Sequence, residues 1–275
     1  MCKRNLFTAI MIVGVSATVF AQKNKEKQDT TAVIKEFMIV CNQYKKLPLH
    51  LSLQQSNSVT FGEPEDSINA NADIYMTEQG SYIKYGEMEQ VVNDSMMLMV
   101  SQGQQVMMLY AAKQDIRQQL NSYLGFQLAD SSVLRMAANY TAAFLPVASE
   151  DKKIIELRNR HPLPGTDKVK ETITIRYDSK TKEPEQVIYM RRTLIPIDKT
   201  EWDNAPGHEG VSDKLVIIKD NYFLMNERKE VFDYKKISHD TAIRLPVSMT
   251  DRIRQDVQGK FIPARGFEQY YLSVE

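Results

Sequence analysis

Cysteine and histidine are scarce in this chain, and this limits its covalent and metal chemistry. Only Cys2 and Cys41 occur among 275 residues, and the four histidines are scattered. There is no HExxH pair and no cysteine companion at zinc spacing. Gly-x-Ser-x-Gly elbows, Gly-x-Gly-x-x-Gly turns and phosphate-binding loops are also missing. We therefore predict no catalytic residue, no metal ligand and no cofactor, and an enzyme ranks third among the functions considered.

Neither sign of charge prevails, and long apolar runs are rare. The chain has 35 Lys+Arg against 35 Asp+Glu, a pI near 6.9 and a mean hydropathy of −0.40. This balance argues against a nucleic-acid binder, a polybasic membrane protein and a disordered tail. With 43% hydrophobic residues, the chain has enough apolar material for a sizeable core.

The first 21 residues form the one marked apolar run. Lys3 and Arg4 precede residues 6–20, which end at the small residue Ala21. This pattern predicts a secretory signal peptide cleaved between Ala21 and Gln22. The alternative, a retained anchor, is disfavoured because a span needs ~20 mostly apolar residues. After cleavage no transmembrane span and no disulfide partner for Cys41 remain, so we expect a periplasmic protein without cross-links.

Periodicity predicts a polar leader over residues 22–30 and then a single domain over 31–275. Val33, Phe37, Val40, Cys41 and Tyr44 recur at helical spacing, and Cys41 is expected to be a buried small hydrophobe. Alternating strands follow at 47–53 and 68–76, and turn residues then divide 82–110 into antiparallel hairpins.

Helical spacing returns over 111–124 and again from the cap cluster 130–132 to Phe144, before Pro146. Further strands are predicted at 153–158, 171–177, 186–193, 214–218, 222–225 and 231–234, with a turn-rich connection over 196–210 that holds Trp202. The predicted fold class is α+β, with a long antiparallel sheet and helices on one face.

In two methionine-rich segments, the side chains on both sides of the predicted strand are apolar. Residues 96–100 read Met-Met-Leu-Met-Val, and residues 106–109 read Val-Met-Met-Leu. Strands of this kind are covered on both faces. One face is expected to meet the helices, and the other needs a second layer, a ligand or a partner protein. Methionine suits variable apolar ligands, but the same residues would equally well fill an ordinary core.

The order of elements resembles the LolA/LppX-like superfamily of periplasmic lipoprotein carriers. The likeness is closest at Tyr82-Ile83-Lys84-Tyr85, then Met96 to Val100, the Gly103 turn and Val106 to Tyr110. The resemblance implies a curved half-barrel sheet whose concave face is closed by helices into an apolar cavity for acyl chains. The chain departs from the transport members, which carry an arginine on an early strand, because it has no arginine between Arg4 and Arg117.

Two functions follow. The first is a soluble carrier or binder of a lipid, an acyl chain or a lipoprotein, and not of nucleic acid. Its expected lining is Leu49, Leu51, Ile74, Met97, Met99, Met107 and Leu109, with Val133, Ala137 and Phe144 from the helices.

The second function is a non-enzymatic interaction module of a cell-envelope assembly. This module would present the 196–210 loop or the C-terminal aromatic residues Phe261, Phe267, Tyr270 and Tyr271 to an envelope protein. Three tripeptides, at 66–68, 94–96 and 240–242, also look like the short O-glycosylation signal of Bacteroidetes envelope proteins.

Overall fold

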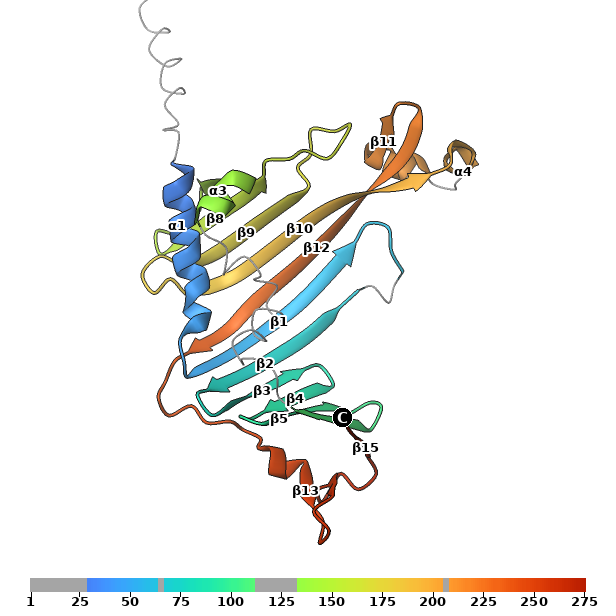
Figure 1. Ribbon diagram of the computed structural model, residues 1–275. Coiled ribbons are helices and arrows are strands. Elements are labelled where there is room, and N and C mark those ends of the chain that lie inside the picture. Colours follow the sequence, from blue (N-terminus) through green and yellow to red (C-terminus); the bar gives the residue numbers. More distant parts are fainter. Residues whose placement is uncertain (1–28, 64–66, 112–132, 205–207) are drawn as a thin grey trace, which may run out of the picture.

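A computed structural model describes residues 29–63, 67–111, 133–204 and 208–275 of the chain (Figure 1). The predicted signal peptide, most of the polar leader, the helix expected over 111–124 and the cap cluster at 130–132 lie outside these residues.

The described residues form one large antiparallel sheet with short helices (Figure 1). The sheet has 13 strands, in the order β15-β6-β5-β4-β3-β2-β1-β12-β10-β9-β8-β7, and β11 pairs with β12. Among the strand pairs of the described residues, only that of β15 with β6 is parallel. The strands are β1 (Leu49–Val59), β2 (Asn69–Thr77), β3 (Gly80–Tyr85), β4 (Met88–Val92), β5 (Met96–Ser101), β6 (Val106–Ala111), β7 (Tyr140–Leu145), β8 (Lys152–Asn159), β9 (Glu171–Asp178), β10 (Pro184–Ile197), β11 (Leu215–Ile218), β12 (Asn221–Ser238) and β15 (Tyr271–Val274). A separate hairpin joins β13 (Ile253–Gln255) to β14 (Phe261–Pro263).

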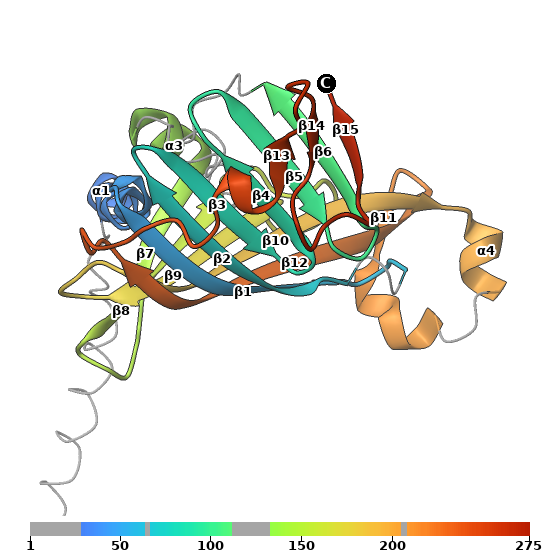
Figure 2. The ribbon, with the colours of Figure 1, turned by 90° about the horizontal axis from the view of Figure 1, so that it is seen from below.

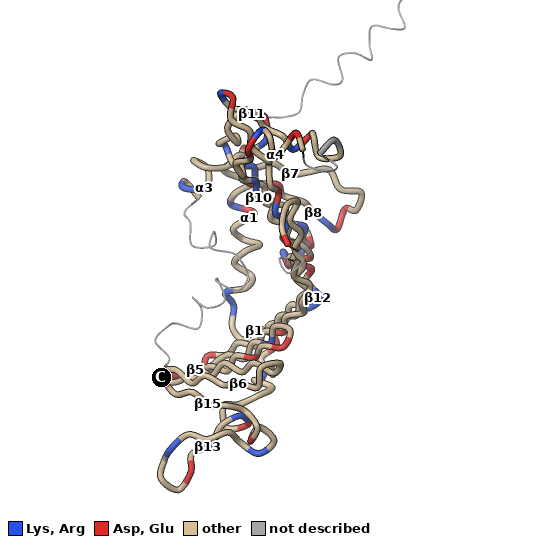
Figure 3. Tube along the Cα trace, turned by 90° about the vertical axis from the view of Figure 1, so that its right-hand side faces the viewer, with Lys and Arg blue, Asp and Glu red and all other residues tan. Residues whose placement is uncertain are grey.

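The sheet is strongly curved, which gives it an inner and an outer face. In side view it bends between β12 and β5, with helix α1 (Thr30–Cys41) inside the bend and β13 outside it (Figure 3). We call the face toward α1 the inner face and the opposite one the outer face. This open, curved antiparallel sheet with helices on its concave side confirms the predicted fold class (Figure 2).

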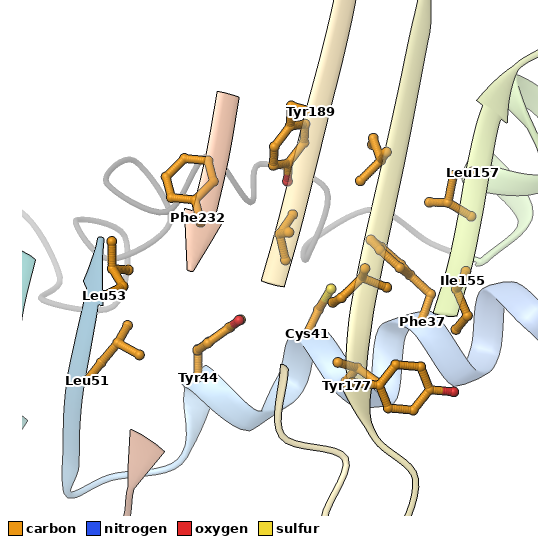
Figure 4. Close-up of a cluster of buried hydrophobic side chains, with 14 of the residues drawn as sticks. Phe37, Cys41, Tyr44, Leu51, Leu53, Ile155, Leu157, Tyr177, Tyr189 and Phe232 are labelled. Carbon is orange, nitrogen blue, oxygen red and sulfur yellow. The ribbon is translucent and has the colours of Figure 1, made fainter. Parts of the chain in front are cut away.

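Helix α1 forms where the apolar stripe predicted it. Asp29 accepts a hydrogen bond from the backbone N–H of Thr31 at 2.9 Å and so caps the first turn. A short 3-10 turn, η2 (Asn42–Lys45), extends the helix as far as the buried Tyr44. The stripe Val33, Ile34, Phe37, Val40 and Cys41 is almost fully buried against the inner face (Figure 4). Burial of this stripe holds the helix on the sheet.

The predicted helix up to Phe144 is wrong in its second half. Helix α3 spans Val133–Asn139, and β7 begins at Tyr140 and pairs with β8. Tyr140 and Ala142 are buried, whereas Thr141 is exposed, which is the period of a strand. Leu134, placed on the predicted apolar stripe, is 80% exposed. A run as short as residues 140–145 fits the spacing of apolar residues in a helix as well as that in a strand. Pairing with β8 selects the strand.

The connection over 196–210 is more ordered than predicted. Strand β10 continues to Ile197, and helix α4 (Lys199–Asn204) buries Trp202. A 3-10 segment, η5 (His208–Lys214), then leads into β11. The two predicted strands at 222–225 and 231–234 are parts of the single long strand β12, and a last 3-10 turn, η6 (Met249–Asp251), precedes β13.

Candidate functional site

The inner face of β1 to β6 is an uncharged surface. Cross-strand partners on this face form three rows, and none of the residues in them carries a charge. The rows are Leu49, Met76, Ser81, Val92, Met97 and Tyr110; Leu51, Ile74, Ile83, Gln90, Met99 and Met108; and Leu53, Ala72, Tyr85, Met88, Ser101 and Val106. Such a surface suits an apolar ligand better than a polar one.

The methionines at the β5–β6 end of this surface are only half-buried. Met97, Met99 and Met108 are all in this state, as is Tyr110, whereas Leu49, Leu51 and Ile74 near α1 are fully buried. Polar groups contact two of the sulfurs. Gln90 Nε2 lies 3.3 Å from Met97 Sδ, and the Tyr110 hydroxyl lies 3.2 Å from Met108 Sδ. Flexible, polarizable thioethers therefore make up the accessible part of the inner face.

Buried hydroxyls and a thiol lie where α1 meets the sheet. Tyr44 stacks on Tyr234 with ring centroids 5.6 Å apart, and Cys41 lies beside them (Figure 4). Burial raises the pKa of Cys41, Tyr44 and Tyr234. These groups therefore stay neutral at physiological pH. The burial of Cys41 confirms its predicted role as a small hydrophobe, since a neutral thiol is a poor nucleophile.

On β9, β10 and β12, the charged residues of the inner face lie at the end away from η2, which we call the rim; the end near η2 is the base. Arg191 on β10 and Arg228 on β12 are register partners. Arg191 Nε lies 3.2 Å from Glu171 Oε1, and Arg228 Nε lies 3.0 Å from Glu230 Oε1. The Tyr140 hydroxyl donates to Glu171 Oε2 at 2.6 Å. The inner face is therefore apolar at its base and charged at its rim.

The outer face of β3 to β6 is covered by the C-terminal part of the chain. Leu98, Val100, Met107 and Leu109 are fully buried there, in one cluster with Met249 and Ile253. Phe261, Phe267, Tyr270 and Leu272 pack against this cluster. The sequence predicted that these strands are covered on both faces. On the outer face, the C-terminal part of the chain provides the cover.

This layer corrects two expectations. Met107 and Leu109 point to the outer face, so they do not share a surface with Met97 and Met99. The reason is parity, because neighbouring residues of a strand face opposite sides. Three of the four C-terminal aromatic residues are packed on the sheet, and Tyr271 alone is largely exposed, at 69%. The aromatic residues proposed for an interaction module are therefore used, in part, to pack the C-terminal segment on the sheet.

A buried ion pair fixes the C-terminal layer to the sheet. Glu89 is 3% exposed, and Arg252 Nη2 lies 2.9 Å from Glu89 Oε2. Gln102 Nε2 donates to Glu89 Oε1 at 2.7 Å, and the guanidinium lies 4.7 Å from the ring centroid of Phe267. Burial and the neighbouring carboxylate raise the pKa of Tyr82 to about 12. Both charges are thus paired, as their burial requires.

The outer face also has a polar hollow of about 390 Å³ over β1 to β3. Amide, hydroxyl and charged groups line it, among them Asn69, Asn71, Asp73 and Lys84. This lining is unsuited to an acyl chain, and the hollow lies on the opposite face from the apolar rows. No group of three or more metal-ligating side chains occurs within the described ranges. Nor does any helix there have the length and apolar character to cross a membrane.

The structure brings six of the ten predicted lining residues into one cluster. Leu49, Leu51 and Ile74 belong to the inner core, and Val133, Ala137 and Phe144 pack on it or form part of its edge. Met97 and Met99 extend the same face toward β6. Sequence reasoning missed Tyr189, Phe232 and Tyr234, which complete the inner face on β10 and β12. Their alternation marked them as strand residues, but no sequence signal showed that β12 pairs with β1.

No family model and no curated protein matches the chain. Three solved structures align with 78% of it: a DUF1329 family protein from Desulfovibrio piger (10% identity, TM-score 0.27, 95% of that chain covered), the Mycobacterium tuberculosis lipoprotein LppX (8%, 0.36, 100%) and a LolA superfamily protein from Nitrosomonas europaea (9%, 0.25, 94%). Two of these structures carry the LppX and LolA names of the superfamily that the sequence resembles. Their identities and TM-scores establish neither a family nor a ligand for this chain.

Proposed function

We propose that the chain is a non-enzymatic carrier or binder of apolar, lipid-like ligands, which lie against the inner face of the curved sheet. The observation that carries this proposal is the uncharged inner surface, with half-buried methionines at its β5–β6 end. Removal of an acyl chain from water onto such a surface is favourable at about 25 cal/mol per Å² of apolar area.

A direct test is native mass spectrometry of the protein purified from its own envelope without detergent. We expect an acyl-containing adduct that is released on denaturation. Absence of any such adduct, together with failure to bind an uncharged fluorescent probe such as N-phenyl-1-naphthylamine, would overturn the proposal.

Substitution of one inner methionine locates the bound molecule. We expect Met99→Gln to weaken binding of the probe on the order of fivefold, since an amide replaces an apolar contact. Met190→Gln is the matched control, because Met190 is a half-buried strand methionine on the outer face of β10. Equal effects of the two substitutions, measured by probe fluorescence, would place the molecule elsewhere.

We also propose that the protein works in the periplasm after loss of residues 1–21. The support is the charged start, the apolar run and the small residue at Ala21. The intact mass of the protein recovered from cell envelopes tests this, with Gln22 expected as its first residue. Recovery of the full-length chain would contradict it.

A further inference from the structure

Two arginines lie directly opposite each other at the rim of the inner face. Arg191 and Arg228 are paired in the β10–β12 register. They share the face of the buried Tyr189 and Phe232, which lie nearer the base. Like charges placed opposite each other in an antiparallel pair repel, and here a glutamate beside each arginine offsets the repulsion.

Both guanidinium groups keep their outer ends available. Each pairs with one glutamate through its Nε atom, at 3.2 Å for Arg191 and 3.0 Å for Arg228. The side chains of Arg191 and Arg228 are 63% and 50% exposed. The fork that binds phosphate or carboxylate oxygens in two-point contacts is therefore accessible on both residues.

The glutamates hold the forks in position. Glu171 is 19% exposed in its side chain and accepts a hydrogen bond from the buried Tyr140. The Glu230 side chain is 26% exposed. Burial, and after it the negative charge of Glu230, raise the pKa of Tyr85, so the Glu230 carboxylate lies near the apolar rows. Side chains held in this way lose less conformational freedom when an anion binds.

We infer that Arg191 and Arg228 form the headgroup site for an anionic amphiphile, whose phosphate or carboxylate group binds at the rim while its acyl chain lies on the inner face. This inference rests on the proposed function and narrows its ligand class. An uncharged lipid would gain only the apolar contacts. An anionic lipid would gain charge-assisted hydrogen bonds in addition.

The test displaces N-phenyl-1-naphthylamine from the purified protein with two ligands of equal acyl chain. One is lysophosphatidic acid, and the other is the corresponding uncharged monoacylglycerol. We expect lysophosphatidic acid to bind at least about tenfold more tightly. The double variant Arg191→Gln/Arg228→Gln should abolish this preference and change monoacylglycerol binding by less than about twofold. Arg191→Lys/Arg228→Lys should give an intermediate preference, because an ammonium lacks the planar fork.

The matched control is Arg158→Gln/Arg176→Gln on the outer face. These arginines are 57% and 45% exposed, and each faces a glutamate through Nε, so the same charge is removed from the same kind of setting. The control should keep the preference. Retention of the preference in Arg191→Gln/Arg228→Gln, or its equal loss in the control, would overturn the inference.

The remaining outcomes separate this inference from the proposed function. Equal binding of both lipids by the native protein overturns the headgroup site and supports the carrier. Binding of neither lipid overturns the carrier and the site together. Displacement of lysophosphatidic acid by inorganic phosphate at similar concentrations would show a site for the free anion and overturn the lipid headgroup assignment.

Discussion

The two faces of strands β3 to β6 carry similar apolar side chains but have different surroundings. On the outer face, Leu98, Val100, Met107 and Leu109 are sealed by the C-terminal residues. On the inner face, Met97, Met99 and Met108 are half-buried, and the nearest fully buried core lies under α1. An apolar strand face thus shows that cover is needed, but its residue types do not show what provides the cover.

The comparison also shows that the two covers are held in different ways. Helix α1 is held by an apolar stripe that includes Phe37 and Val40, whereas the largely irregular C-terminal layer combines apolar contacts with polar anchors. One of these is the buried pair of Glu89 and Arg252. Irregular segments lack the repeated contacts of a helix, so single anchors carry more of their attachment.

The largest expected effect comes from removal of this anchor. Arg252→Leu leaves the Glu89 carboxylate buried without its counter-charge, and we expect a loss of about 3–5 kcal/mol in the free energy of unfolding. Denaturant titration measures it. The control is Glu89→Met/Arg252→Leu, which removes both charges and should recover most of the loss. A double variant no more stable than Arg252→Leu would contradict this account.

Neighbouring methionines on β6 give a sharper comparison. Met107 is fully buried on the outer face, and Met108 is half-buried on the inner face. Met107→Gln should lower the free energy of unfolding by about 2–4 kcal/mol, because it buries an amide in a packed core. Met108→Gln should lower it by less than about 1 kcal/mol. Similar losses in thermal unfolding would show that the two faces are equally packed.

The smallest expected effect concerns Glu36 on α1, whose carboxylate contacts Tyr177 and Lys182. Burial raises the pKa of Glu36, but hydrogen bonds from Lys182 and Tyr177 and the nearby positive charges outweigh it and lower the pKa below its ordinary 4.5. A lowered folded-state pKa contributes stability that is present above pH 4.5 and is lost as the pH falls through the folded value. Glu36→Gln should therefore be destabilising at pH 7, by about 1 kcal/mol.

The pH dependence distinguishes this effect from lost packing. The difference in unfolding free energy between the native protein and Glu36→Gln should shrink as the pH is lowered from 6 to 3. Glu150→Gln, at an exposed glutamate before β8, is the control and should show no such trend. A difference for Glu36→Gln that stays constant over this range would contradict the assignment to the carboxylate.

Much of the fold was predictable from local patterns. The stripe from Val33 to Tyr44 predicted α1, and alternation with turn residues predicted the hairpins of β2 to β6. Residues 140–145 were mispredicted because six residues are too few to separate a helical from a strand period. The ordered helix around Trp202 was missed because α4 is short and surrounded by turn residues.

The candidate site was predictable only in part. The two-sided apolarity of residues 96–100 and 106–109 predicted cover on both faces; the outer face is covered by the C-terminal residues, whereas the inner face is only half-buried. Sequence did not assign the faces, so Met107 and Leu109 were placed with Met97 and Met99. Nothing local placed Arg191 opposite Arg228, because the two residues are brought together by the pairing of β10 with β12.

The sequence by itself determined most of the helices and strands, and which strands have two apolar faces. These properties depend on side-chain periodicity over a few neighbouring residues. Only the tertiary structure decided that β1 pairs with β12, that the C-terminal residues cover the outer face, and that Arg191 meets Arg228 at the rim. Such pairings join residues far apart in the chain, and they are selected by the burial of the whole surface rather than by any local pattern.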